Sequence, residues 1–263
     1  MAVVSALYVY PVKSCRGIRV TEWQVVERGF VYDRRWMIVD KSGQFVTMRE
    51  LPELTRVTTR LSGERLQLDA PGLATLELPL AYETGEERPV QVWGDAVQAV
   101  VHPGGSAWFS SHLGAPHSLV YMPESERRQV NPARARSGDI VSFADAYPFL
   151  VISEASLADL NARLPSPVTM DRFRPNIVVS GTAPFAEDDY SHVRMGEISF
   201  RGPKRCERCV ITSIDPETGA VSNEPQRTLA TYRREGSKVW FGMNLIHDST
   251  GTLRVGDAVN TDV

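Results

Sequence analysis

The chain has 263 residues, of which 42% are hydrophobic and 23% charged, a composition typical of a soluble globular protein. This length is sufficient for one large domain or two modest ones with a sizeable core. The net charge of −3 gives no reason to expect nucleic acid or an anionic membrane surface as a partner.

The N-terminal segment, residues 1–10, starts as a strand-like alternation and has no basic residues, so it does not resemble a signal peptide. No apolar run approaches the roughly 18–20 residues that span a bilayer. Only three cysteines occur, too few for a disulfide framework or an internal iron–sulfur cluster. We therefore expect a protein of the reducing cytoplasm without membrane association.

The first hundred residues predict β structure. Short runs rich in Val, Leu, Tyr and Trp are interrupted about every eight to twelve residues by turn signals. We expect strands at 36–40, 65–69 and 89–93, and the alternation of polar and apolar residues in 65–69 is typical of a half-buried strand. This spacing favours a compact barrel or sandwich.

Two later segments predict helices. Residues 106–113 end at Gly114, a common helix C-cap, and residues 153–164 have Ser153 as a candidate N-cap. Strand signals then return at 176–180, 197–201, 210–214, 239–241 and 252–255. We therefore predict a mostly β protein with a few helices and place a domain boundary near residue 100, which gives segments 1–100 and 101–263.

An arginine-rich stretch lies between the two predicted helices. Residues 125–137 are polar, show little apolar periodicity and contain Arg127, Arg128, Arg134 and Arg136. We predict a surface loop or lid for this stretch.

The most informative segment for chemistry contains Cys206 and Cys209, surrounded by Lys204, Arg205 and Arg208. Cations beside a thiol favour the thiolate form. The apolar run 210–214 predicts a following strand, and residues 215–219 its turn. We therefore expect the two thiols to lie where a loop enters a sheet, a place that supports a rigid site.

Several interpretations of this cysteine pair are open. A structural zinc site needs more ligands than one Cys-x-x-Cys, and the five histidines are scattered singly. A thioredoxin-like dithiol precedes a helix, whereas a β-branched run follows here. The cysteines can also be small buried hydrophobic residues, although their basic neighbours argue against this. The pattern favours one thiolate ligand to a soft metal, with the other cysteine in a lesser role.

Motifs over nearly the whole chain resemble the MOSC (molybdenum cofactor sulfurase C-terminal) family, of the type with an N-terminal MOSC β-barrel domain. Within it, the chain is particularly similar to the mitochondrial amidoxime-reducing component and its bacterial relatives. The motifs are Tyr-Pro-Val-Lys-Ser-Cys-Arg-Gly at 10–17, Tyr-Asp-Arg-Arg-Trp at 32–36, Phe-Arg-Pro-Asn-Ile-Val at 173–178, Cys-x-x-Cys at 206–209 and Val-Gly-Asp at 255–257. The resemblance implies an N-terminal β-barrel-like domain at 1–100 and a MOSC β-barrel domain at 101–263.

The resemblance also implies a molybdenum cofactor, molybdenum bound to molybdopterin, with Cys209 as both the metal ligand and the catalytic residue. The cofactor contacts that it implies are Lys13, Ser14, Arg34, Arg174 and Asn176, together with Asp145 and Arg208. These residue types suit a cofactor that carries a phosphate and a hydrogen-bonding pterin. Singly, each has an ordinary alternative, such as a solvated surface charge for Lys13 or a turn for Asp145.

The first functional hypothesis is a molybdenum oxidoreductase that reduces N-hydroxylated or N-oxide small molecules. Oxygen leaves such a substrate as the metal is oxidised, and electrons must then return. Some bacterial relatives carry a ferredoxin-like domain after the MOSC region, whereas this sequence has no cysteines after residue 209. A separate electron-transfer protein is therefore the expected partner.

Two other classes of function are open. Cys209 can hold the cofactor, or a persulfide, for delivery to another enzyme, as a cofactor carrier or sulfur-transfer protein. The sulfurase that gives the family its name has a separate sulfur-mobilising domain, and we expect neither that domain nor a pyridoxal phosphate site in this chain. The third class is a cofactor-free binding protein on a reused fold.

Overall fold

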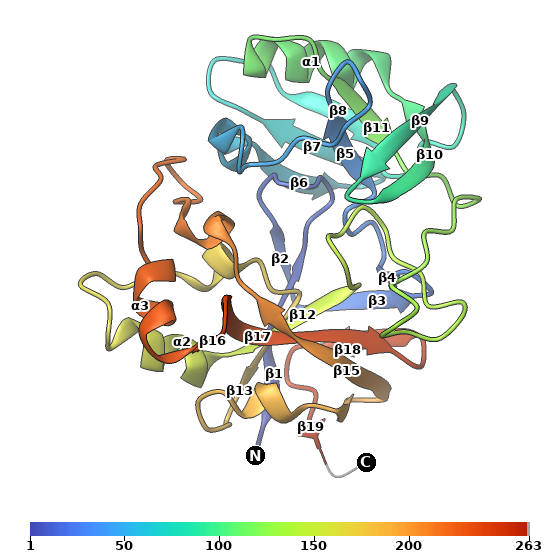
Figure 1. Ribbon diagram of the computed structural model, residues 1–263. Helices are drawn as coiled ribbons and strands as arrows, with labels where there is room; N and C mark the ends of the chain where they lie inside the picture. The colour runs from blue at the N-terminus through green and yellow to red at the C-terminus, as the bar shows by residue number, and fades with distance from the viewer. Residues whose placement is uncertain (262–263) are drawn as a thin grey trace.

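Two β-rich parts lie one above the other in Figure 1, a computed structural model that describes residues 1–261. The lower part is built on a nine-stranded sheet and the upper part on two smaller sheets. The first strand of the chain belongs to the lower part, so the chain starts there, crosses to the upper part and returns.

The large sheet contains strands from both ends of the chain. Its neighbours in order are β19 (Val259–Asn260), β14 (His192–Met195), β15 (Ile198–Glu207), β17 (Lys238–His247), β12 (Phe149–Ser153), β13 (Ile177–Ser180), β1 (Val3–Val9) and β2 (Ile18–Val20), and β16 (Arg234–Glu235) pairs with β17. β12 and β13 are parallel and are joined through helix α2 (Glu154–Asn161), whereas the other neighbours are antiparallel. Parallel neighbours require such a crossover connection.

Three smaller sheets complete the β structure. Beside the large sheet lie β18 (Gly251–Arg254), β3 (Glu22–Val26) and β4 (Gly29–Phe30). The upper part contains one sheet of β5 (Trp36–Val39), β11 (Ser118–Tyr121), β10 (Asp95–Val101) and β9 (Glu86–Val92), and another of β6 (Thr58–Ser62), β7 (Arg65–Asp69) and β8 (Leu76–Pro79). Within residues 1–261 no sheet closes into a ring through its paired strands alone, although Val3 of β1 forms an isolated antiparallel bridge with Ala258, next to β19.

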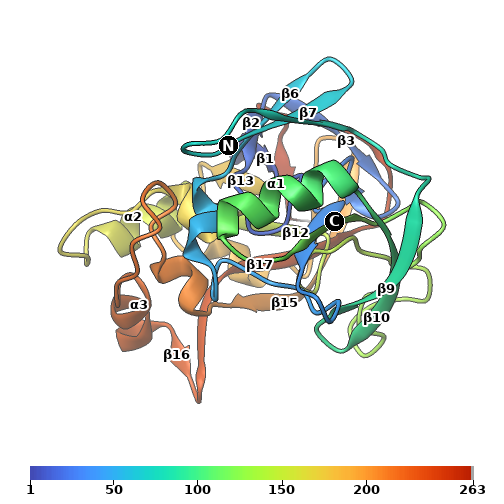
Figure 2. The ribbon, with the colours of Figure 1, turned by 90° about the horizontal axis from the view of Figure 1, so that it is seen from above.

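The helices are short and cover the sheets from outside. Helix α1 (Pro103–Leu113) lies on top of the upper part, at the end far from the large sheet (Figures 1 and 2). α3 (Gln226–Tyr232) and α2 lie on the same side of the lower part. The 3-10 helices are η1 (Pro52–Arg56), η2 (Met170–Phe173), η3 (Ala186–Asp189) and η4 (Val210–Ser213).

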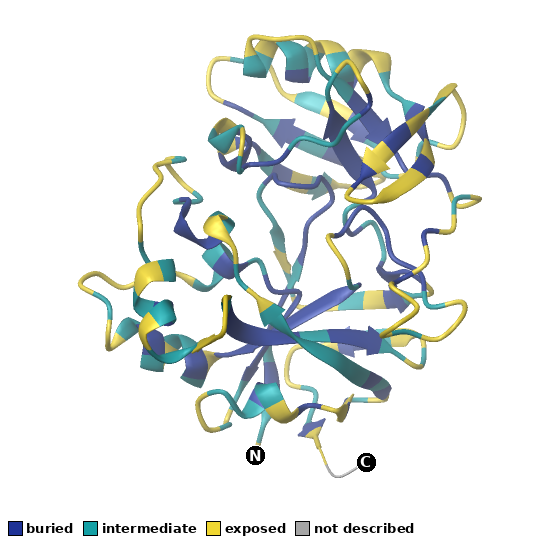
Figure 3. Ribbon diagram, in the orientation of Figure 1, coloured by how far each residue is buried: buried dark blue, intermediate teal, exposed yellow. Residues whose placement is uncertain are grey.

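The amino-acid composition of each strand explains which of its residues are buried in the core. Every residue of β12 is buried, as expected for a central strand rich in Val, Ile, Leu and Phe. β1 instead alternates buried and partly buried residues, as a strand with one exposed face does. Figure 3 shows β12 and β17 of the large sheet mostly buried, β15 mostly intermediate and many turns exposed. The upper part has apolar clusters of its own around Trp36 and Met37.

The prediction of a mostly β chain with a few helices is confirmed. Ser153 caps α2, because its side chain accepts a hydrogen bond from the Ser156 amide, and Gly114 ends α1 in the left-handed conformation. The strand predicted at 210–214 is wrong, since those residues form η4. The domain boundary near residue 100 stays a prediction, although strands from both sides of it share the large sheet.

The prediction of a surface loop at 125–137 is only partly right. Arg127, Arg134 and Arg136 are exposed, but Arg128 is buried. Its guanidinium donates to the main-chain oxygens of Ser142 and Ala144, at 2.9 and 2.6 Å. This arginine therefore fixes the segment that leads to residue 145. The proposed lid function stays a prediction.

Candidate functional site

A cavity of about 260 Å³ lies between segments from the first fifty residues and strands and turns that follow residue 140. All eight residues predicted for the site line it: Lys13, Ser14, Arg34, Asp145, Arg174, Asn176, Arg208 and Cys209. Five separate chain segments contribute these side chains, and folding brings them together. Their roles as cofactor contacts stay predictions.

The two cysteines lie at the end of a strand. Cys206 is part of β15, which ends at Glu207, and Cys209 follows it directly before η4. The expectation that the thiols lie where a loop enters a sheet is therefore wrong, because the chain leaves the sheet there. Cys209 is exposed, whereas Cys206 is partly buried, and both line the cavity.

Arg208 lies between the two cysteines in the sequence, and two hydrogen bonds hold its guanidinium in place. Its guanidinium donates to the Phe173 main-chain oxygen at 2.8 Å and to the Cys206 sulfur at 3.0 Å. Its Nε is buried and has no protein partner among the described residues. A donor left unpaired in a lined cavity is a natural contact for an incoming ligand.

Backbone strain gathers at the cavity. Six non-glycine residues in 1–261 have a positive φ, and three of them are the site residues Ser14 (71°), Arg34 (49°) and Arg174 (56°). A fourth, Trp93 (54°), contacts Asp145. Such residues are uncommon and cluster where function requires a particular geometry. This observation points to the cavity independently of any resemblance.

Lys13 is buried and forms an ion pair across the cavity wall. Its Nζ donates to the Phe143 main-chain oxygen at 2.8 Å and to the Asp145 carboxylate. Burial lowers the pKa of Lys13, and the nearby Asp145 opposes this shift. Burial alone would raise the pKa of Asp145, but the charge and hydrogen bond of Lys13 hold it well below its usual range. The Asp145 carboxylate is therefore charged at neutral pH.

The two other predicted cations pack on one tyrosine. The guanidinium carbons of Arg34 and Arg174 both lie 4.3 Å from the centre of the Tyr10 ring, which is 1% exposed. Arg34 donates to the Asn176 side-chain oxygen at 2.9 Å and to buried Asp33. Arg174 donates to the Cys15 main-chain oxygen at 2.7 Å.

Sequence reasoning missed three residues at this site: Tyr10, Arg49 and Trp93. Tyr10 opens the motif at 10–17 that was singled out, and its aromatic ring was the available signal. Arg49 lies in the turn between β5 and η1 and Trp93 in the turn between β9 and β10, and neither belongs to a recognised motif. Only the folded chain brings them to Asp145 and Cys209.

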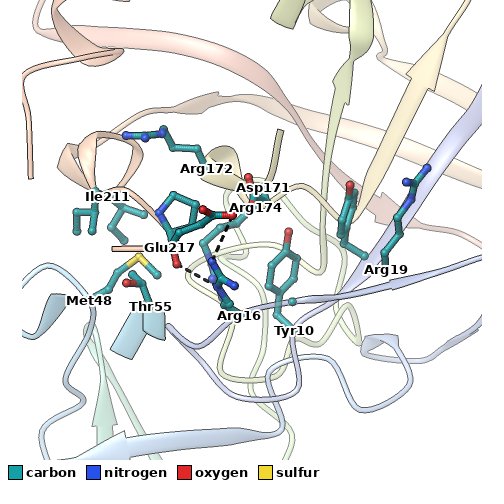
Figure 4. Close-up of a pocket in the computed structure, with 14 residues that line it drawn as sticks. Tyr10, Arg16, Arg19, Met48, Thr55, Asp171, Arg172, Arg174, Ile211 and Glu217 are labelled. Carbon is teal, nitrogen blue, oxygen red and sulfur yellow. Dashed lines mark hydrogen bonds and ion pairs between the residues drawn. The ribbon is translucent and has the colours of Figure 1, made fainter. Parts of the chain in front are cut away.

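A second cavity of about 190 Å³ adjoins the first and shares Met48, Arg174 and Ile211 with it. Figure 4 shows Arg16 beside the Tyr10 ring, with its guanidinium bonded to the Pro216 oxygen at 3.0 Å and near Glu217 at 4.0 Å. The arginines of this cavity are thus mostly engaged by the protein.

The donor set of the main cavity suits an anionic organic group with a soft metal. Lysine, hydroxyl, guanidinium and amide groups face one exposed thiol. No cluster of three or more His, Cys, Asp or Glu side chains able to hold a metal ion occurs within residues 1–261. A metal at Cys209 would therefore need further ligands from the bound group itself.

The fold and this thiol-containing cavity define a two-part β protein. Residues 1–116 match the MOSC N-terminal beta barrel domain, and residues 138–260 match the MOSC domain. The chain belongs to the family of proteins that join these two domains.

Curated relatives match over almost the whole chain. It is 34% identical to mitochondrial amidoxime-reducing component 1 of Homo sapiens and 35% identical to mitochondrial amidoxime reducing component 2 of Rattus norvegicus, in each case over 97% of this chain and 82% of the relative. It is 32% identical to molybdenum cofactor sulfurase of Oryza sativa subsp. japonica, over 93% of this chain and 32% of that protein. Among the described helices, none is both long and apolar enough to cross a membrane.

Proposed function

We propose that this protein binds a molybdenum–pterin cofactor through the Cys209 thiolate and reduces N-hydroxylated or N-oxide small molecules with electrons from a separate protein. The single observation that carries the proposal is that Cys209 and all seven other predicted contacts line one cavity. Relatives named as amidoxime-reducing components, about one-third identical over nearly the full chain, support the reaction class.

The residues of the cavity fit such a group. Lys13, Arg34 and Arg174 supply positive charge, which suits a phosphate, and Asn176 supplies an amide. The buried, unpaired Nε of Arg208 supplies a further donor beside the thiol. A thiolate is the ligand type that soft metals prefer.

In this proposal the cofactor and the protein residues have separate roles. The cofactor, when bound, supplies the oxygen-transfer redox chemistry. Cys209 fixes its metal, and the cations orient its anionic end. Because Cys209 is exposed, a small substrate and an electron donor can both reach this end of the cavity. Neither the donor nor the cytoplasmic location is identified by the chain, and both belong to the proposal.

The decisive experiment compares two cysteine variants made in a host that produces the cofactor. We expect Cys209→Ala to lose molybdenum and all reduction of benzamidoxime with an artificial electron donor. Cys206→Ala, the matched control, should keep about one molybdenum per chain. Metal analysis of both purified proteins measures this. Full molybdenum content in Cys209→Ala would show that the ligand assignment is wrong.

The exposure of Cys209 also favours a second candidate, a carrier that transfers the cofactor or a sulfur atom to another enzyme. The similarity to the molybdenum cofactor sulfurase is consistent with this candidate. Molybdenum in the wild-type protein without reduction of any N-hydroxylated or N-oxide compound by any donor would support the carrier over the reductase.

A further inference from the structure

An arginine from the upper part of the molecule reaches the candidate metal ligand. Arg49 lies in the turn between β5 and η1, and one of its terminal nitrogens is 3.7 Å from the Cys209 sulfur. That distance is within hydrogen-bonding range for a sulfur acceptor. Only 18% of the Arg49 side chain is exposed, so its charge lies against the protein and not free in water.

Two other side chains hold this guanidinium in place. The Asp145 carboxylate lies 3.4 Å from the same Arg49 nitrogen. The Trp93 ring packs against the guanidinium, with 4.9 Å between its centre and the Arg49 carbon. Trp93 in turn donates from its indole nitrogen to Asp145 at 3.3 Å. Arg49, Trp93 and Asp145 therefore form a closed triangle beside Cys209.

The backbone at Trp93 gives an independent sign that this arrangement has a function. Trp93 has a φ of 54°, a left-handed conformation that a bulky residue rarely adopts, and it is followed by Gly94. Trp93 is 48% exposed, and its ring packs beside Phe45, with 5.1 Å between ring centres. Because Trp93 is half exposed, its burial does not offset the free-energy cost of the left-handed backbone conformation. The strained turn instead aims the indole ring at Arg49 and Asp145.

We infer that Arg49 is a positioning residue for the Cys209 sulfur, held by Trp93 and Asp145, and that it tunes any metal bound there. The effect on the metal rests on the proposed function, whereas the position of the charge does not. Hydrogen bonds to a ligand sulfur and nearby cations reduce the electron density that the sulfur gives to its metal, which favours the reduced metal. Loss of Arg49 should therefore make reduction of the metal harder.

The position of the charge is tested on the full-length, cofactor-free chain, with Cys206→Ser as background so that Cys209 is the one exposed thiol of the three cysteines. Negatively charged iodoacetate and neutral iodoacetamide both react with the thiolate, so the ratio of their rates reports local charge and cancels thiolate content and access. We expect Arg49→Gln to lower the iodoacetate-to-iodoacetamide ratio about twofold to fivefold at low salt. High salt should shrink the difference.

Four further variants keep this test specific. Arg49→Lys retains the charge and should restore most of the ratio. Trp93→Leu frees the guanidinium and should lower the ratio partly, whereas Trp93→Phe should not. Arg60→Gln removes an equal charge from an exposed ion pair with Asp69 and should leave the ratio unchanged. An Arg49→Gln ratio equal to that of the background protein would overturn the inference.

The effect on the metal is tested by redox titration of the loaded protein, followed by the paramagnetic resonance signal of molybdenum. We expect a more negative midpoint potential in Arg49→Gln than in wild type, with unchanged molybdenum content. An unchanged potential would overturn the tuning role even if the charge is correctly placed. A wild-type protein that takes up no molybdenum would instead contradict the proposed function, and the alkylation ratio would still decide the position of Arg49.

Discussion

The buried ammonium group of Lys13 requires partners, because removing an unpaired charge from water costs several kcal/mol. The Phe143 oxygen and the Asp145 carboxylate supply them. Asp145 is itself 49% exposed at its side chain and also accepts from Arg49 and Trp93. One carboxylate thus joins a buried lysine to the arginine beside Cys209. It acts as a support for the cations, a role that suits an acidic residue better than direct contact with a phosphate.

This role predicts a pH dependence of stability that Asp145→Asn removes. Because the pKa of Asp145 is lowered in the folded protein, its stabilising contribution is present above the unfolded value, about 4, and is lost as the pH falls below it. We expect wild type to exceed Asp145→Asn in free energy of unfolding at pH 5–7. The difference should shrink between about pH 4 and pH 3. Urea denaturation across this range measures it, and a constant difference would contradict the assignment.

Single residues differ in how far the sequence reveals them. The motifs contain seven of the eight predicted side chains that line the cavity, whereas Asp145 lies outside them and was implied by the resemblance alone. Arg49 and Trp93 could not be found in this way. Their importance depends on contacts with residues 52 to 160 positions away along the chain, which only the tertiary structure creates. Tyr10 is intermediate, since it lies in a motif but acts through Arg34 and Arg174.

At the scale of elements, β15 is the least regular strand near the site. Its pairing with β17 shifts register between Arg201 and Lys204 and again between Arg205 and Glu207. A regular strand points alternate residues to opposite faces, whereas four consecutive residues here, 204–207, line the cavity. Bulges of this kind redirect side chains. They explain how Lys204, Arg205 and Cys206, at the end of one strand, all line the same cavity.

The prediction of a strand at 210–214 failed for a related reason. The β-branched residues there suggest a strand, but β15 already has neighbours on both sides, and the chain leaves the sheet after Glu207. Val210 is 48% exposed, so the apolar run is not a buried strand face. The Thr212 amide and hydroxyl instead bond the Cys209 oxygen, which closes η4. Tertiary context overrides β-propensity in such short runs.

The first bulge of β15 depends on Gly202. A Cβ added at Gly202 would lie 1.9 Å from the Tyr190 main-chain oxygen, a contact that only backbone movement can relieve. We expect Gly202→Ala to lower the free energy of unfolding by about 1–3 kcal/mol. Gly104→Ala is the matched control, because its Cβ would meet ordinary contacts of 3.6 Å within α1 and alanine favours a helix. Urea denaturation compares the two, and equal stability of Gly202→Ala and wild type would refute the packing argument.

At the scale of the whole molecule, the cavity requires both ends of the chain. Lys13 and Ser14 follow β1, a strand of the large sheet, while Arg49 comes from the upper part. Cys209 lies almost two hundred residues after Lys13 and 160 residues after Arg49. The mostly β class could be predicted from turn spacing, and the resemblance of the motifs implied the family. That both ends of the chain contribute strands to the large sheet could not be predicted, because local sequence patterns carry no information on which strands pair.

This sharing predicts that the segment 101–263 does not fold alone, although it contains the whole match to the MOSC domain. Without β1, strand β13 loses the partner that covers its edge, and the core loses buried Val4, Leu7 and Val9. Each fully buried aliphatic side chain contributes about 1.5–3 kcal/mol, so these three alone account for much of a typical domain's stability. We expect fragment 101–263 to lack a cooperative urea transition by circular dichroism. Addition of fragment 1–100 should restore one. Cooperative unfolding of 101–263 by itself would show that the large sheet is stable without its N-terminal strands.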